Sequence, residues 1–116
     1  MDELDTTAIK WLAPWSPVID PAARDRYEAE LQRELGPDHP LLGRPALAIA
    51  WRSDCDDVLF AVRNPGELAV VHLTYSSDAP ERTGWPETQV FSTVAAFVEE
   101  CMMPEHEDFS WGEPGP

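Results

Sequence analysis

The fold is decided by residues 45–75, which read PALAIAWRSDCDDVLFAVRNPGELAVVHLTY. This stretch holds three short apolar segments, rich in β-branched and aromatic residues, that are separated by two groups of turn-forming residues. The turn formers are SDCD at residues 53–56 and NPGE at residues 64–67. We therefore predict three consecutive antiparallel strands, and we expect the rest of the chain to cover the sheet that they form.

The two turns also predict how these strands pair. A turn centred on Pro65 and Gly66 places apolar residues opposite one another on one face, and a shift by one residue would scatter them. A two-residue type II turn fits the twist of strands poorly, so a longer or bulged loop is the alternative. The expected pairs are Val62 with Ala69, Phe60 with Val71, Val58 with Leu73, Trp51 with Val58, Ile49 with Phe60, and Leu47 with Val62.

In this register the opposite face carries small or polar side chains. We name it the alanine-rich face, and we expect it to be shallow and mixed, whereas the face with the large residues forms the core. The sequence leaves open whether the alanine-rich face is exposed. Its expected members are Ala46, Ala48, Ala50, Arg52, Leu59, Ala61, Val70, His72 and Thr74.

Two helices are predicted, over about residues 20–35 and 93–102. In the first, Asp20 is a good N-cap, Pro21 suits the first helical position, and Gly36 ends the helix. The second begins after Ser92 and is expected to stop before Pro104, because proline disrupts a helix interior. Each has an apolar stripe at helical spacing. The stripes are Ala23, Tyr27, Leu31 and Leu35, and Val94, Phe97, Val98, Cys101 and Met102.

These elements predict the α+β class in one domain, residues 1–116, with an antiparallel sheet of three to four strands. Both helices are expected on one face of the sheet, in the order α-β-β-β-(β)-α, with residues 88–91 as the candidate fourth strand. The apolar segment around Trp11 and Trp15 is expected to lie across the sheet or a helix. Residues 1–7 and 112–116 are expected to be disordered.

The chain carries a net charge of −14, because it has 22 acidic residues and only 8 basic ones. Such a surface repels phosphate, which argues against nucleic-acid binding and against an anionic membrane surface. It suits a basic protein partner, since complementary fields steer encounter, although solubility alone also explains an acidic surface. The acidic start, residues 1–5, is unlike a signal peptide, and no apolar stretch reaches membrane-spanning length, so we expect a cytoplasmic protein.

Residue patterns for catalysis or metal binding are weak. Residues 54–57 (DCDD) concentrate carboxylates, but they lack the alternation, the glycine and the closing glutamate of a calcium loop. His39 and His106 lie beside acids, yet a zinc site needs three or four converging ligands. The aspartates around Cys55 oppose formation of a thiolate. We therefore predict no catalytic residue, no metal and no cofactor.

Two surfaces are candidate binding sites. The first is an acidic-aromatic C-terminal patch, in which carboxylates would steer a basic partner and aromatics would anchor it, unless the aromatics fold back onto the core. The second is the part of the alanine-rich face that bears Arg52, Asp57 and His72, where Asp57 lies diagonally across the strand pair from His72. The patch comprises Glu99, Glu100, Glu105, Glu107, Asp108 and Trp111.

Six short segments carry a family resemblance. They are HPLLG at 39–43, DCDDVLF at 54–60, VVHLT at 70–74, WP at 85–86, VEE at 98–100 and MPEHE at 103–107. Together they resemble a group of short, stand-alone, uncharacterised bacterial proteins, over about residues 39–108. The resemblance implies a self-contained bacterial cytosolic domain, and it brings no activity, cofactor or site residue.

From these observations we expect a non-catalytic protein-binding domain, similar in role to an immunity protein or an antitoxin, with a basic protein as its partner. Two alternatives stay open. One is a small ligand-binding or enzymatic module that uses Arg52, Asp57 and His72. The other is a structural homo-oligomer, such as a homodimer in which two alanine-rich faces pack together.

Overall fold

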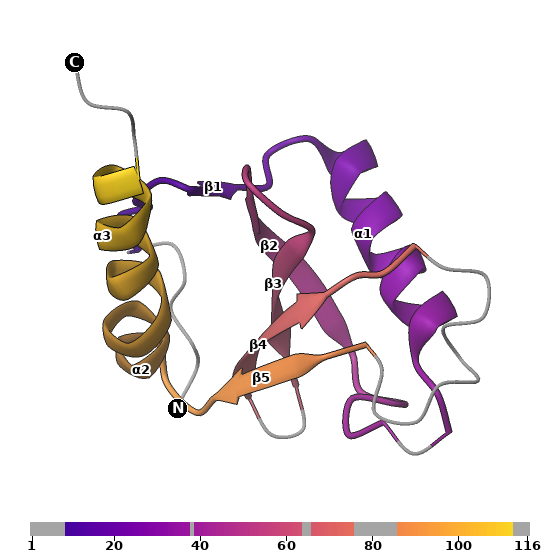
Figure 1. Ribbon diagram of the computed structural model, residues 1–116. Coiled ribbons are helices and arrows are strands. Elements are labelled where there is room, and N and C mark those ends of the chain that lie inside the picture. The colour runs from indigo at the N-terminus through magenta and orange to yellow at the C-terminus, as the bar shows by residue number, and fades with distance from the viewer. Residues whose placement is uncertain (1–8, 38, 64–65, 76–85, 113–116) are drawn as a thin grey trace.

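The computed structural model describes residues 9–37, 39–63, 66–75 and 86–112, and in these ranges the chain forms one five-stranded antiparallel sheet (Figure 1). Each strand pairs with its neighbours in sequence, in the order β1-β2-β3-β4-β5. The α+β class and the antiparallel sheet are confirmed, but the predicted number of strands is too small, because part of the apolar N-terminal segment adds β1. The strands are β1 (Trp15–Pro17), β2 (Ala46–Arg52), β3 (Asp57–Val62), β4 (Glu67–His72) and β5 (Thr88–Phe91).

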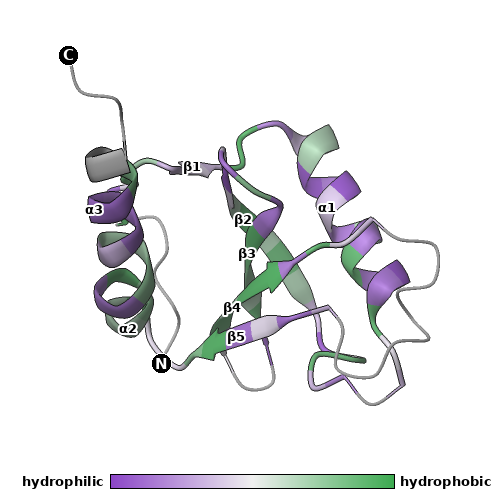
Figure 2. Ribbon diagram, viewed as in Figure 1, coloured by the Kyte–Doolittle hydropathy of each residue, from purple (hydrophilic) through white to green (hydrophobic). Residues whose placement is uncertain are grey.

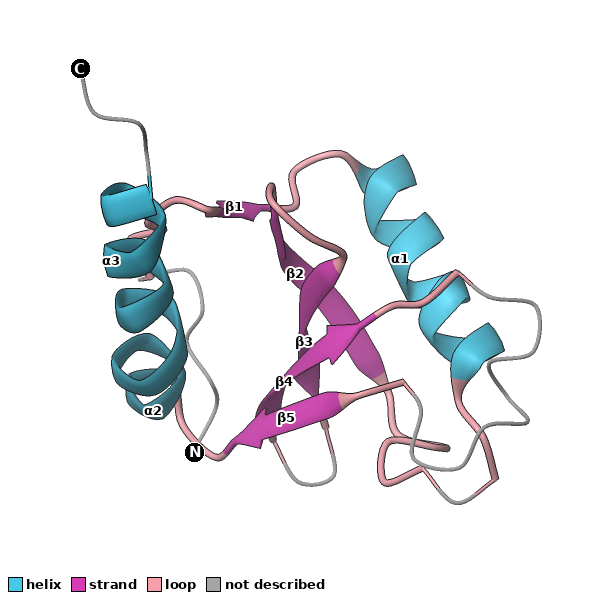
Figure 3. Ribbon diagram, in the orientation of Figure 1, coloured by secondary structure: helices cyan, strands magenta, loops and turns pink. Residues whose placement is uncertain are grey.

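Helices cover both faces of this sheet. Helix α1 (Pro21–Glu34) lies against one face, and a continuous helical segment at residues 94–112, which we name the C-terminal helix, lies against the other (Figure 3). The expectation that both helices pack on one face is wrong. The C-terminal helix is built from α2 (Val94–Phe97), a π-helical turn η3 (Val98–Met102) and α3 (Met103–Gly112).

Helix α1 forms where its capping residues predict. Asp20 is the N-cap, its side chain accepts a hydrogen bond from the Ala22 N–H, and Pro21 is the first helical residue. At its other end Glu34 is fully buried, and its carboxylate accepts hydrogen bonds from the N–H groups of Thr74 and Tyr75 at 2.7–3.0 Å. The helix is therefore tied to the chain just after β4.

The pairing of β3 with β4 differs from the prediction by two residues. Val58 lies opposite Val71 and Phe60 opposite Ala69, so the connection is four residues long, 63–66. The longer loop that was the alternative is therefore the one observed. A shift by two residues leaves every side chain on its predicted face, because side chains alternate with a period of two.

Strand β2 contains a β-bulge that the sequence pattern did not predict. Trp51 pairs with Val58 as expected, but Phe60 pairs with Ala48, and Ile49 is the extra residue. The bulge inverts the alternation. Ile49 therefore faces the C-terminal helix, while Ala48 faces α1 and Leu47 is 46% exposed. The predicted pairs of Ile49 with Phe60 and of Leu47 with Val62 are wrong.

Helix α1 supplies a physical reason for the bulge. The N–H of Ala48 donates to the Glu28 carboxylate at 2.9 Å, and its carbonyl accepts from Arg24 Nε at 3.1 Å. Strand β1 pairs with β2 only from Ala50 to Arg52, so the edge of β2 beyond it needs other partners. Two side chains from α1 close that edge and hold the bulge in place.

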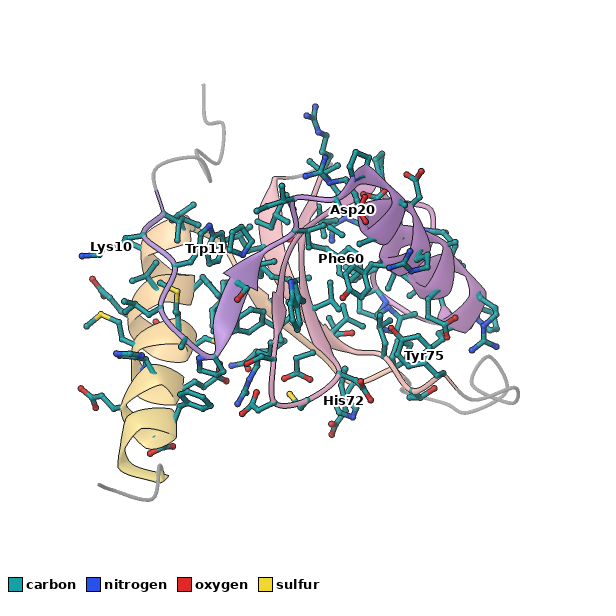
Figure 4. The ribbon with its side chains drawn as sticks, turned by 90° about the horizontal axis from the view of Figure 1, so that it is seen from above. Lys10, Trp11, Asp20, Phe60, His72 and Tyr75 are labelled. Carbon is teal, nitrogen blue, oxygen red and sulfur yellow. The ribbon has the colours of Figure 1, made fainter. Side chains whose placement is uncertain are left out.

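Each face of the sheet has its own apolar core. On the α1 side Phe60 is fully buried between the sheet and the helix (Figure 4). On the other side Phe97 of the C-terminal helix makes edge-to-face contacts with Trp15 and Phe91 at 5.5 and 5.8 Å between ring centroids. The alanine-rich face is thus covered over Ala50, Leu59 and Val70.

The C-terminal helix is longer than predicted. Its N-cap is Thr93, whose hydroxyl accepts from the Ala96 N–H at 3.0 Å, and it continues through Pro104 to Gly112. In the π turn the Met103 N–H bonds to the Val98 carbonyl, five residues back. This wider turn comes directly before Pro104, where the proline ring would clash with an ordinary α-helical backbone. Of the residues expected to be disordered, Gly112 is the last residue of α3, and 1–7 and 113–116 lie outside the described ranges.

Candidate functional site

Arg52 is the centre of a polar cluster at one end of the sheet. Its Nε and Nη2 atoms donate to the two carboxylate oxygens of Asp54 at 2.8 and 2.7 Å. Its Nη1 lies 3.2 Å from Glu105 Oε2 on the C-terminal helix and 3.8 Å from Asp57 Oδ2. Burial alone would lower the pKa of Arg52, but the hydrogen bonds to Asp54 and the charge of Glu105 outweigh it and raise that pKa. Arg52 therefore stays charged.

Asp57 and His72 form a direct cross-strand pair. They lie opposite each other on β3 and β4, and His72 Nδ1 is 2.7 Å from Asp57 Oδ1. The prediction had placed them diagonally, and the two-residue shift in register brings them together. The side chain of His72 is 44% exposed, at the rim of the sheet (Figure 4).

A cleft of about 370 Å³ opens beside this pair. Two carboxylates and one histidine make it polar, with Val70 as its apolar wall. Arg52 and His72 both lie near Asp57, on its two different carboxylate oxygens, but only Asp57 and His72 line the cleft. Besides Val70 of the alanine-rich face, the cleft adds Glu87, Thr88 and Gln89, which no sequence pattern indicated as site residues. The lining residues are Asp57, Val70, His72, Glu87, Thr88 and Gln89.

The acidic C-terminal patch divides in two. Glu105 turns inward, where it accepts from Trp15 Nε1 at 2.7 Å as well as contacting Arg52. The remaining carboxylates lie on the solvent side of the C-terminal helix, whose α3 part is largely hydrophilic (Figure 2). The side chain of Trp111 lies outside the described part of the structure. The exposed members are Glu99, Glu100, Glu107 and Asp108.

No known protein family, curated protein or solved structure matches the chain. Function must therefore be argued from the geometry alone. Within the described ranges, no helix combines the length and apolar character that crossing a membrane requires.

The histidines outside the cleft are hydrogen-bonded, and of the two cysteines Cys101 is buried and Cys55 is exposed. His39 Nδ1 accepts from the Leu41 N–H, so the proton is on Nε2, which lies 3.0 Å from the Pro86 carbonyl. His106 Nδ1 bonds to the Ala13 carbonyl at 2.7 Å. Burial raises the pKa of both cysteine thiols, and nearby carboxylates add to this effect. No three His, Cys, Asp or Glu side chains converge as metal ligands among the described residues.

One contact of the polar cluster had no sequence signal. The hydrogen bond from Trp15 to Glu105 joins residues 90 positions apart, and no local pattern indicates it. The cleft residues on β5 and directly before it were also missed, because Glu87 and Gln89 come to lie beside His72 and Val70 only through the pairing of β4 with β5.

Proposed function

We propose that the chain is a non-catalytic protein-binding domain whose partner is a basic protein, similar in role to an immunity protein or an antitoxin. The partner docks on the solvent side of the C-terminal helix. The supporting observation is the arrangement of charge on that helix.

Four carboxylates, Glu99, Glu100, Glu107 and Asp108, are exposed on the C-terminal helix, which contains no lysine or arginine. None of the four forms an ion pair with a described residue. In contrast, Arg33, Arg44 and Arg52 are paired with carboxylates elsewhere. These four carboxylates are therefore unpaired within the described residues, and a cationic surface would gain both steering and ion pairs there. Exposed Met103, at 44%, lies between the carboxylates and offers an adaptable apolar contact.

The test is affinity capture from the native host at low salt. We name Glu100→Gln/Glu107→Gln the helix variant and Asp25→Asn/Asp56→Asn the control variant. Both remove two exposed charges, so the net charge rises from −14 to −12 in each. Wild type and the control variant should recover the same basic protein, and 0.5 M salt should release it.

With the purified partner, the helix variant should bind about tenfold more weakly, and the control variant should bind within about twofold of wild type. Recovery of no basic protein would contradict the proposal. Equal affinity of the helix and control variants would show that the C-terminal helix is not the docking face.

A further inference from the structure

Strand β5 is the last strand of the sheet, and among the described residues no further strand pairs with its outer edge, which lies beside the cleft. The His72 N–H donates to the Glu87 carbonyl at 2.9 Å, so the backbone groups of Glu87 and Gln89 point toward β4. By the alternation of an antiparallel ladder, the N–H and C=O of Thr88 and Val90 point away from it. No hydrogen bond to the Val90 backbone groups comes from a described residue. Val90 itself is 41% exposed.

The cleft lies on the same side of β5 as Glu87 and Gln89. A strand added at the edge runs about 4.8 Å from β5, with every second side chain on the cleft side. A long cationic side chain there would lie across Glu87 and enter the cleft toward Asp57, which is only 18% exposed. Partial burial strengthens such an ion pair compared with one in open solvent.

We propose that the partner presents an extended basic segment that pairs with β5 and places an arginine or lysine in the cleft. The segment gains main-chain hydrogen bonds from the edge and specificity from the cleft. Charge complementarity selects this occupant, because the cleft contains the carboxylates of Glu87 and Asp57, although Asp57 also contacts His72 and lies 3.8 Å from Arg52. The inference rests on the proposed function for the basic nature of the partner, but the residues that bind the segment are those of β5 and the cleft, not those of the C-terminal helix.

The probes are capped seven-residue peptides in which valine and threonine alternate around a central arginine. One matched peptide has citrulline in place of arginine, and another has an N-methyl group on a backbone nitrogen that faces β5. Isothermal titration should show binding of the arginine peptide, and each of these two changes should weaken it about tenfold or more.

Protein variants test the same two elements. Val90→Pro removes the outward N–H without removing a bond to β4, and Glu87→Gln removes a cleft charge. Each should weaken arginine-peptide binding about tenfold, whereas Val90→Thr, which keeps the N–H, should bind within about twofold of wild type. Slow hydrogen exchange of the Gln89 amide confirms that β5 is still paired in each variant. If the Gln89 amide is no longer protected in Val90→Pro, main-chain pairing with β5 is tested instead by the binding of the N-methylated peptide to wild type.

Equal binding of the arginine and citrulline peptides, no effect of N-methylation, or no binding at millimolar concentration would each overturn the inference. The helix variant separates it from the proposed function. If that variant captures the partner as wild type does while the peptide still needs β5, the helix docking face is wrong and this inference stands. If the helix variant no longer binds the arginine peptide while Val90→Pro still binds it, this inference fails and the C-terminal helix remains the docking face.

Discussion

Glu34 is the residue whose chemistry is most constrained by the fold. Its side chain is 0% exposed, and both of its oxygens accept hydrogen bonds from backbone N–H groups of Thr74 or Tyr75. Tyr75 has a φ of 55°, which is uncommon for a residue other than glycine. The carboxylate stabilises this turn, because two successive N–H groups converge on it.

Glu34→Gln should lower the free energy of unfolding by about 1–3 kcal/mol at pH 7, because an amide NH₂ would then face a buried N–H donor. Urea unfolding measures the change. Asp25→Asn, which alters an exposed carboxylate of α1, should change it by less than about 0.5 kcal/mol. Equal stability of the two variants would show that the carboxylate does not hold the turn.

The pH dependence of this effect has a defined sign. Burial raises the pKa of Glu34, and a hydrogen bond with Glu30 adds to the rise, although the backbone N–H groups oppose it. Between the ordinary pKa and the raised one, the folded state binds more protons than the unfolded state, so stability falls as pH increases. The advantage of wild type over Glu34→Gln should therefore shrink from pH 4 upward, and an advantage that grows with pH would contradict the assignment.

At the scale of elements, local sequence patterns predicted the helix and strands whose bounds depend on interactions between residues close in sequence. Strands were expected within residues 45–75 and a helix over 20–35, and these elements lie within those bounds because caps, turns and alternation act over a few residues. The bulge at Ile49 is held by Arg24 and Glu28 of α1, which contact the Ala48 backbone but lie 24 and 20 residues before it in the sequence. No local pattern contains that information.

The bulge also changes the core beneath the C-terminal helix. Because it turns Ile49 to the alanine-rich face, Ile49 joins Leu59 and Phe97 in the core on that side of the sheet. The candidate site was predicted only in part. The pairing of Asp57 with His72 depends on two adjacent strands, whereas Glu105 reaches Arg52 only once the helix is docked.

Two glutamates on the C-terminal helix should behave in opposite ways. Glu105→Ala removes the hydrogen-bond acceptor of Trp15 Nε1 and one of the carboxylates that pair with Arg52. It should therefore lower the free energy of unfolding by about 1–3 kcal/mol. Glu107→Ala, on the exposed side, should change it by less than about 0.5 kcal/mol. Amide hydrogen exchange should accelerate in the C-terminal helix of the first variant and not in α1. Matching exchange in both variants would show that Glu105 does not fasten the helix.

At the scale of the whole molecule, the net charge of −14 opposes compaction, because like charges repel more strongly in the folded state. Salt screens this repulsion over about 10 Å at 0.1 M, so closely spaced charges contribute most. The exposed carboxylates of the C-terminal helix are therefore expected to dominate the effect, although the same repulsion acts over the entire surface.

Raising NaCl from 10 mM to 0.5 M should increase the Tm of wild type by about 4 °C, the shift that about 1 kcal/mol produces in a domain of this size. The increase should be smaller in the helix variant than in the control variant, although both carry a net charge of −12. Differential scanning calorimetry at pH 7 measures all three proteins. Equal increases in the Tm of the two variants would mean that the repulsion is spread evenly over the surface. The C-terminal helix would then not be a distinct electrostatic surface.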